Sequence, residues 1–136
     1  MADNEIQVTF PGGVRVNAEY RGFTIATDQP AYAGGEGSAP SPFDLFLASL
    51  ATCAGYYVIA FCRQRQIPTD GIKLTMRTEK NPETKMIGLV AIDISLPPGF
   101  PVRYREAVVK AAEACAVKAH IQKPPRMEVA AEIRPA

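Results

Sequence analysis

The sequence predicts an α+β protein in which two groups of short strands accompany two helices. Apolar and polar residues alternate in segments 6–27 and 72–96, as they do in half-buried strands. Segments 42–65 and 102–121 lack that alternation and lie between helix start and stop signals. A chain of 136 residues is long enough for one domain with its own core. We therefore expect a single domain over residues 1–136 with the order βββ-α-ββ-α-β and no internal repeat.

The first three strands are expected to form an antiparallel meander. Residues 6–10 alternate cleanly and meet the turn signal Pro11-Gly12-Gly13. Residues 14–20 alternate in the same way, and Arg21-Gly22 separates them from the short apolar segment 23–27. Strands this short with tight turns between them pair with their sequence neighbours.

A Gly-, Pro- and Ser-rich loop over residues 28–41 leads into the first helix. Ser41 is a good N-cap, a proline follows it at the first helical position, and Asp44 stands three residues after the cap. The helix is expected to run to about Arg65, because Pro68 stops it. Asp44 is thereby predicted to complete a capping box.

Eighteen consecutive residues of this helix, Leu45 to Cys62, carry no charge. A run of this length has to be considered as a membrane span. Ser49, Thr52 and Gly55 make it only modestly apolar, and the neighbouring strands need a helix to cover their apolar faces. We therefore favour a central, nearly fully buried helix over a membrane span.

The second half of the chain repeats the change from strands to helix. Residues 72–77 and 89–96 alternate and are expected to form a hairpin across the turn at 80–83. A second helix over about 102–121 follows, with Cys115 on its apolar stripe. After two prolines, alternating residues 127–133 predict a last strand.

Composition excludes several classes of function. A formal charge of +1 offers no general field for a nucleic acid. A single histidine, His120, and three cysteines without a CxxC pair argue against a metal site, and none is expected. The N-terminal residues are acidic and no apolar segment of a signal peptide follows them, so we expect a cytoplasmic protein with reduced thiols.

The three cysteines are therefore the candidate reactive residues, and helix geometry sets one of them apart from the other two. Nine residues of helix turn through about 900°, which places Cys62 on the opposite side from Cys53. Cys53 and Cys115 lie on the apolar stripes of two helices that are expected to pack together, and small neighbouring residues permit a close approach. They form either a reactive pair or two small core residues, since free cysteine is among the most buried residue types.

Residues 38–53, SAPSPFDLFLASLATC, resemble the hallmark segment of the OsmC/Ohr family, whose members carry an SP-x-(E/D)-LLLASLA-x-C helix. The family's second cysteine lies in a later helix, and residues 113–117, EACAV, are similar to its setting. The separation of 62 residues between Cys53 and Cys115 and the order of elements are also similar to the family's. The resemblance covers essentially the whole chain.

This resemblance implies two central helices wrapped by strands in an intertwined homodimer. It also implies a thiol-dependent peroxidase for organic hydroperoxides, in which Cys53 attacks the peroxide and Cys115 resolves the sulfenic acid to a disulfide. An external dithiol would then reduce the disulfide, a lipoyl-type dithiol being one candidate, and no bound cofactor is implied. Neither a nucleic acid nor a membrane is expected as a partner.

The residues that support Cys53 are where the chain departs from the family. The peroxidase branch places a Glu ten residues before the first cysteine, whereas this chain has Phe43 there and Asp44 one residue later. Asp44 either takes the supporting role or serves only as a capping residue. Arg15, after the Gly12-Gly13 turn, is the candidate activator of Cys53, Arg21 is the alternative, and either arginine could be a solvated surface charge.

Two other functions stay open at this point. One is a small-molecule binding dimer of the less characterised OsmC-like branch, with little or no turnover and with cysteines that only pack. The other is a transferase or hydrolase that uses Cys53 alone, which the shortage of histidines disfavours.

Overall fold

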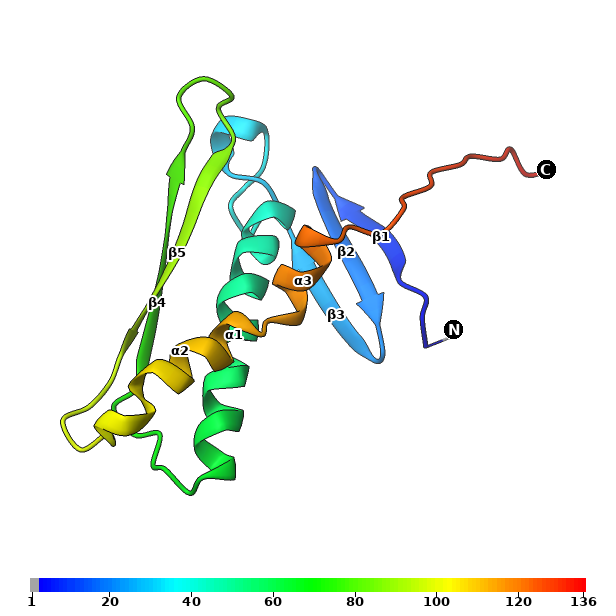
Figure 1. The fold of residues 1–136 in the computed structure, drawn as a ribbon. Coiled ribbons are helices and arrows are strands. Elements are labelled where there is room, and N and C mark those ends of the chain that lie inside the picture. The colour runs from blue at the N-terminus through cyan, green and yellow to red at the C-terminus, as the bar shows by residue number, and fades with distance from the viewer. Residues whose placement is uncertain (1–2) are drawn as a thin grey trace. The chain divides into compact units, whose positions relative to one another are not determined.

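The computed structural model describes residues 3–136 and divides the chain into two units, Met1–Ser49 and Leu50–Ala136 (Figure 1). Strands and helices are both present, which confirms the α+β class. Helix α1 (Pro42–Gln64) contributes residues to both units. The expectation of one domain over residues 1–136 stays a prediction.

Three antiparallel strands form the sheet of the N-terminal unit, in the order β1 (Gln7–Gly12), β2 (Arg15–Tyr20) and β3 (Phe23–Thr27). The register places Ala18 opposite both Val8 and Ile25. The turn between β2 and β3 uses two left-handed residues, Arg21 (φ 50°) and Gly22 (φ 82°), as a tight hairpin turn requires. The predicted meander is confirmed.

The carboxylate of Asp28 organises the loop that follows β3. Asp28 is only 1% exposed. Its Oδ2 accepts hydrogen bonds from the Ser38 hydroxyl at 2.6 Å, the Ser38 N–H at 3.0 Å and the Glu36 N–H at 3.3 Å, and its Oδ1 accepts from the Gln29 N–H at 2.8 Å. These donors stabilise the charged form, Ser38 most of all, and lower the pKa of Asp28 to about 2. The loop is therefore fixed by its first residue.

Asp28 should make the stability of the protein depend on pH in the acid range. Its pKa falls on folding from 3.8 to about 2, so its stabilising contribution is present above about pH 4 and is lost as the pH falls toward 2. We expect Asp28→Asn to destabilise the protein at pH 7 and to flatten the dependence of unfolding free energy on pH between 4 and 2. Denaturant unfolding at several pH values measures this. Asp70→Asn controls for the loss of one exposed negative charge, and an unchanged pH dependence in Asp28→Asn would contradict the assignment.

The start of α1 is fixed by the predicted capping box. The Asp44 N–H donates to Ser41 Oγ at 3.1 Å, and the Ser41 N–H donates to Asp44 Oδ2 at 3.1 Å. Two amide groups that the helix cannot satisfy are thereby paired reciprocally. The helix ends at Gln64, one residue before the predicted end, and Gln66 then adopts a left-handed conformation (φ 56°).

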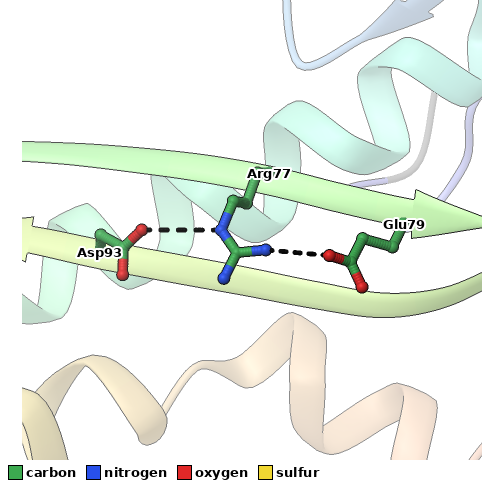
Figure 2. A network of polar contacts seen from close by, with 3 residues as sticks. All are labelled: Arg77, Glu79 and Asp93. Carbon is green, nitrogen blue, oxygen red and sulfur yellow. Dashed lines mark hydrogen bonds and ion pairs between the residues drawn. The ribbon is translucent and has the colours of Figure 1, made fainter.

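A hairpin of β4 (Lys73–Lys80) and β5 (Ile87–Ser95) forms the sheet of the C-terminal unit, as predicted. Arg77 on β4 forms two ion pairs on the exposed face of the hairpin. Its Nη1 lies 3.3 Å from Glu79 Oε1, and its Nε lies 3.9 Å from Asp93 Oδ2 (Figure 2). All three side chains are more than half exposed, and such pairs contribute about 0.2–1 kcal/mol or less. We infer that they help to set the register more than they stabilise the fold.

The core of the C-terminal unit lies between this hairpin and the helices. Helix α1 buries one side, with Leu50, Ala54, Val58 and Phe61 spaced by four, four and three residues. The central cluster of this core contains a cysteine, Cys62, that is fully buried (0% exposed). The members of the cluster are Val58, Phe61, Cys62, Ile67, Phe100 and Val108. Cys62 is thus a packing residue.

The rest of α1 is less covered than predicted. By length and composition α1 could cross a membrane, although core helices of soluble proteins can be as long and as apolar. Only 28% of its most apolar 18-residue stretch is buried within the chain. The expectation of a nearly fully buried helix is therefore wrong for the single chain, because the one hairpin and the short helices that follow it cover one side of α1. Tyr56 and Ile59 are 64% and 47% exposed.

The predicted second helix is interrupted. In place of one helix over 102–121 there is a 3₁₀ turn, η2 (Val102–Tyr104), followed by α2 (Arg105–Glu113) and α3 (Ala116–Gln122). Figure 1 shows the chain turning between α2 and α3. The cause is Cys115, which has an extended backbone (φ −58°, ψ 124°) and caps α3 by accepting a hydrogen bond from the Lys118 N–H at 3.4 Å. Cys115 is therefore an N-cap residue and does not lie on a helical stripe.

The predicted last strand over residues 127–133 is also wrong for this chain. These residues are irregular, and Met127, Val129 and Ile133 are 82%, 99% and 100% exposed. The alternation is present in the sequence, but a strand needs a neighbour whose N–H and C=O groups pair with its own. Within residues 3–136, neither sheet provides one for this segment. The order in the described chain is βββ-α-ββ-α-α.

Candidate active site

The structure brings Cys53 and Cys115 into contact. Cys53 lies in the middle of α1, next to buried Ala54, and Cys115 lies at the junction of α2 and α3. Both are free thiols joined by a side-chain hydrogen bond. Cys53 is half-buried, whereas Cys115 is only 4% exposed. Cys53 is therefore the more exposed residue of the pair.

Backbone amides at the start of α3 hold the sulfur of Cys53. The largest influence on this thiol is a hydrogen bond from the Val117 N–H, followed by one from the Cys115 thiol, and the Ala116 N–H adds a third. All three donors favour the thiolate, and together they lower the pKa of Cys53 below its ordinary value despite the opposing effect of burial. A lower pKa increases the thiolate fraction at neutral pH, and the thiolate is the reactive form.

The pKa of Cys115 moves the other way. Burial is the main cause of its raised pKa, and the neighbouring sulfur of Cys53 adds to the effect, while the Lys118 and Val117 N–H groups oppose it. Cys115 is therefore the weaker acid of the pair and the one that donates the hydrogen bond toward Cys53. The two sulfurs are chemically unequal: Cys53 is prepared as a nucleophile and Cys115 is kept as a thiol.

Two other predicted site residues, Arg15 and Asp44, belong to the N-terminal unit. Asp44 is engaged in the capping box with Ser41. The Arg15 Nε–H donates to the Gly12 carbonyl at 3.2 Å. The alternative arginine, Arg21, lies 4.9 Å from the centre of the Tyr20 ring. That Arg15 or Asp44 supports Cys53 stays a prediction.

Sequence reasoning missed the residues that do contact Cys53 through their backbone, Ala116 and Val117. Because Cys53 lies in mid-helix, far from the N-terminal amides of its own helix, the sequence predicts an activating cation instead. The amides come from a different helix, whose start is marked by neither Gly nor Pro in the stretch EACAVKAH. Backbone donors have no side-chain signature, so no pattern in the sequence could have identified them.

A cavity of about 640 Å³ adjoins the cysteine pair within the C-terminal unit. Its lining includes Cys115 together with Leu50 and Ala54, which lie on α1 on either side of Cys53. Apolar residues of β5 and α2 form much of the rest, and four charged side chains also take part: Asp93, Arg105, Glu113 and Lys118. The volume lies in the range of small-molecule sites. In the described part of the chain, no three His, Cys, Asp or Glu side chains gather as metal ligands.

The contribution of the α3 amides can be tested with Ala116→Pro. Residue 116 is the first residue of α3, where proline is favoured, and the extended backbone of Cys115 suits a residue that precedes proline. The variant loses only the Ala116 N–H, so we expect the pKa of Cys53 to rise. Because such a bond is worth about 0.5–1.5 kcal/mol, reaction of Cys53 at neutral pH should slow roughly two- to tenfold.

The measurement is the rate of Cys53 alkylation by iodoacetamide against pH. Ala116→Ser retains the N–H and serves as the control. The rate of Ala116→Pro should recover at alkaline pH, where Cys53 is ionised in every variant. A profile that matches wild type at neutral pH would contradict the role of this amide.

Fold and cysteine pair together describe an α+β dithiol protein, and comparison with known proteins identifies the family. The family model described as OsmC-like protein matches residues 35–130, so the chain belongs to the OsmC-like family. The resemblance seen in the sequence is thereby confirmed. No curated protein matches this chain.

Solved structures share the fold. A Psychrobacter arcticus 273-4 protein, named for osmotic stress induction and a detoxification response, is 25% identical with a TM-score of 0.72, over 88% of this chain and 87% of that one. A Legionella pneumophila organic hydroperoxide resistance protein is 25% identical with a TM-score of 0.58, over 90% and 92% of the two chains. The organic hydroperoxide resistance protein OhrB of Bacillus subtilis is 21% identical with a TM-score of 0.51, over 88% and 92%, and supports the fold alone.

Proposed function

We propose that this protein is a thiol-dependent peroxidase that reduces organic hydroperoxides through Cys53 and Cys115. The observation that carries the proposal is the contact between the two sulfurs, in which the Val117 N–H and the Cys115 thiol stabilise the Cys53 thiolate. The naming of a 25% identical Legionella relative as an organic hydroperoxide resistance protein supports the same reaction class.

The proposed reaction has three steps. The Cys53 thiolate attacks the terminal oxygen of the hydroperoxide, the O–O bond breaks, and Cys53 becomes a sulfenic acid while the alkoxide takes a proton and leaves as an alcohol. Cys115 then attacks the sulfenic sulfur, which releases water and forms the 53–115 disulfide. An external dithiol returns both cysteines to thiols and is itself oxidised to a disulfide.

The raised pKa of Cys115 is compatible with its resolving role. Burial is the main cause of that raised pKa, and the hydrogen bond that Cys115 donates to the sulfur of Cys53 in the resting protein adds to it. Oxidation of Cys53 removes the negative charge that holds this proton. Cys115 then becomes a better nucleophile at the moment when the sulfenic acid needs resolving.

We also propose a homodimer as the working form. Apolar side chains of α1 such as Tyr56 and Ile59 are exposed in the single chain, and so is the alternating segment 127–133. A second copy that covered them would remove apolar surface from water and provide the strand neighbour that the C-terminal segment lacks. Sedimentation velocity or light scattering would test this assembly.

The cavity beside Cys115 favours a second candidate, a small-molecule binding dimer with little turnover. Consumption of cumene hydroperoxide by the wild-type protein with dithiothreitol separates the two. We expect sustained consumption, together with a loss of two hydrogens in the non-reducing mass after one equivalent of peroxide. A protein that binds the hydroperoxide but does not consume it would exclude the peroxidase and favour binding.

A further inference from the structure

Only one of the two cysteines lines the cavity. Cys115 is part of its lining, whereas Cys53 is not, although Leu50 and Ala54 on the same helix are. Cys53 is nevertheless the more exposed of the two residues in the chain as a whole. Within the cavity the pair is therefore met at Cys115, and the exposed surface of Cys53 lies outside the cavity lining.

We propose that the dithiol reductant enters this cavity and attacks the sulfur of Cys115, so that Cys53 is always the leaving group of the 53–115 disulfide. The inference rests on the proposed function and adds to it the sulfur that is attacked and the surface that admits the reductant. Peroxide and reductant would then use different entrances to the same cysteine pair.

The chemistry of the two sulfurs favours this direction of attack. In thiol–disulfide exchange the sulfur that leaves fastest is the one whose thiolate is most stable. The Val117 and Ala116 N–H groups point at the sulfur of Cys53 and accept the charge that develops there as the S–S bond breaks. Burial disfavours the thiolate form of Cys115. Cys115 is therefore the poorer leaving group, and its sulfur is the better site of attack.

The atoms and electrons balance in two exchanges. One thiolate of the reductant bonds to Cys115 Sγ, the 53–115 bond breaks, and Cys53 leaves as a thiolate. The second thiol of the reductant loses its proton to solvent and attacks the reductant sulfur of the mixed disulfide. Cys115 leaves, takes up a proton, and the reductant departs as a cyclic disulfide after giving two electrons to the protein.

The cavity suits a small dithiol on an apolar chain. Its volume of about 640 Å³ is sufficient for such a molecule, and its walls are largely aliphatic, with Ile92 and Ile94 from β5 and Val109 and Ala112 from α2. The two cationic and two anionic side chains of the lining balance one another, which favours an uncharged reductant over a strongly charged one.

The direction of attack is tested on wild-type protein without peroxide. Diamide oxidises the pair to the disulfide, excess 2-mercaptoethanol opens it, and iodoacetamide quenches the mixture within the first turnover. Peptide mass mapping should find mercaptoethanol on Cys115 and the alkyl group on Cys53. Adducts found mainly on Cys53, or no 53–115 disulfide after diamide, would overturn the proposal.

The route is tested with a matched pair of variants. Val109 lines the cavity, whereas Val102 is 85% exposed and lies outside its lining. Val109→Trp should slow reduction of the diamide-formed disulfide by dithiothreitol about tenfold or more by obstructing access, while Val102→Trp should match wild type. Equal rates in the two variants would overturn the cavity route.

These tests separate the inference from the proposed function. The disulfide is made with diamide, so its direction of opening can be mapped even if the protein consumes no hydroperoxide. Conversely, a protein that consumes hydroperoxide but carries the mercaptoethanol adduct on Cys53 retains the proposed function and loses this inference. The adduct mapping uses wild-type protein and does not depend on whether Val109→Trp folds.

Discussion

Cys53→Ser should abolish peroxide consumption, with a loss on the order of 10⁴-fold or more, as removal of the nucleophile does in other enzymes that use covalent catalysis. A serine hydroxyl is not ionised at neutral pH, and the α3 amides that stabilise the Cys53 thiolate cannot make it so. The fold should be retained, because the substitution is nearly isosteric at a half-buried position. Consumption of cumene hydroperoxide with excess dithiothreitol is the measurement.

Cys62→Ala is the matched control on the same helix. Cys62 is fully buried among Val58, Phe61 and other core residues, and burial raises its pKa while Arg65 opposes this. The variant should lose some stability from the small cavity that it creates, and it should consume peroxide at the wild-type rate. If Cys53→Ser retained activity and Cys62→Ala lost it, the assignment of the reactive thiol would be reversed.

Local patterns were sufficient to predict most of the fold. The alternation in residues 7–27 and 73–95 produced the expected meander and hairpin, because each strand pairs with its neighbour across a short turn. The capping box of Ser41 and Asp44 fixed the start of α1 to the residue. Turn and capping signals lie within a few residues of the strand or helix that they determine, so a single sequence contains them.

The two errors in the second half have a shared cause, because local patterns do not decide which distant contacts form. Residues 127–133 alternate as a strand should, but in the described chain they pair with neither sheet. The helix over 102–121 breaks at Cys115, where the side chain caps α3 and meets Cys53, 62 residues earlier in the sequence. The local sequence predicts neither the contact between Cys115 and Cys53 nor the lack of a strand partner for 127–133 in the described chain.

The candidate site was predicted only in part, because some of its contacts come from residues far from Cys53 in the sequence. Helix geometry separated Cys62 from Cys53 and left Cys53 and Cys115 as a possible pair, and the structure places those two sulfurs in hydrogen-bond contact. The sequence predicts a charged side chain as the source of activation, whereas the contacts on Cys53 come from the Val117 and Ala116 N–H groups of α3 and from the Cys115 thiol. Arg15 and Asp44 stay predictions, since their contacts in the N-terminal unit, with Gly12 and Ser41, do not bear on Cys53.

Replacement of Cys115 by two different residues should separate its two roles, resolution and hydrogen bonding to Cys53. Cys115→Ser retains a hydroxyl donor beside Cys53, whereas Cys115→Ala removes the donor that helps to lower the pKa of Cys53. Both variants lose the resolving thiol. Turnover with millimolar dithiol should therefore fall about 100-fold or more in both, because an oriented intramolecular thiol acts at an effective concentration far above that of the free dithiol. Excess hydroperoxide should then leave Cys53 with two added oxygen atoms, as a sulfinic acid.

The first step should distinguish the two variants. In a single turnover at neutral pH, we expect Cys115→Ser to form the sulfenic acid nearly as fast as wild type, and Cys115→Ala to form it more slowly, with the difference vanishing at alkaline pH. Stopped-flow mixing with one equivalent of hydroperoxide, followed by dimedone labelling and mass analysis, measures that step. Wild-type turnover in either variant would contradict the resolving role. Equal first-step rates in both at neutral pH would instead contradict the hydrogen bond from Cys115, and the activation of Cys53 would then rest on the Val117 and Ala116 amides alone.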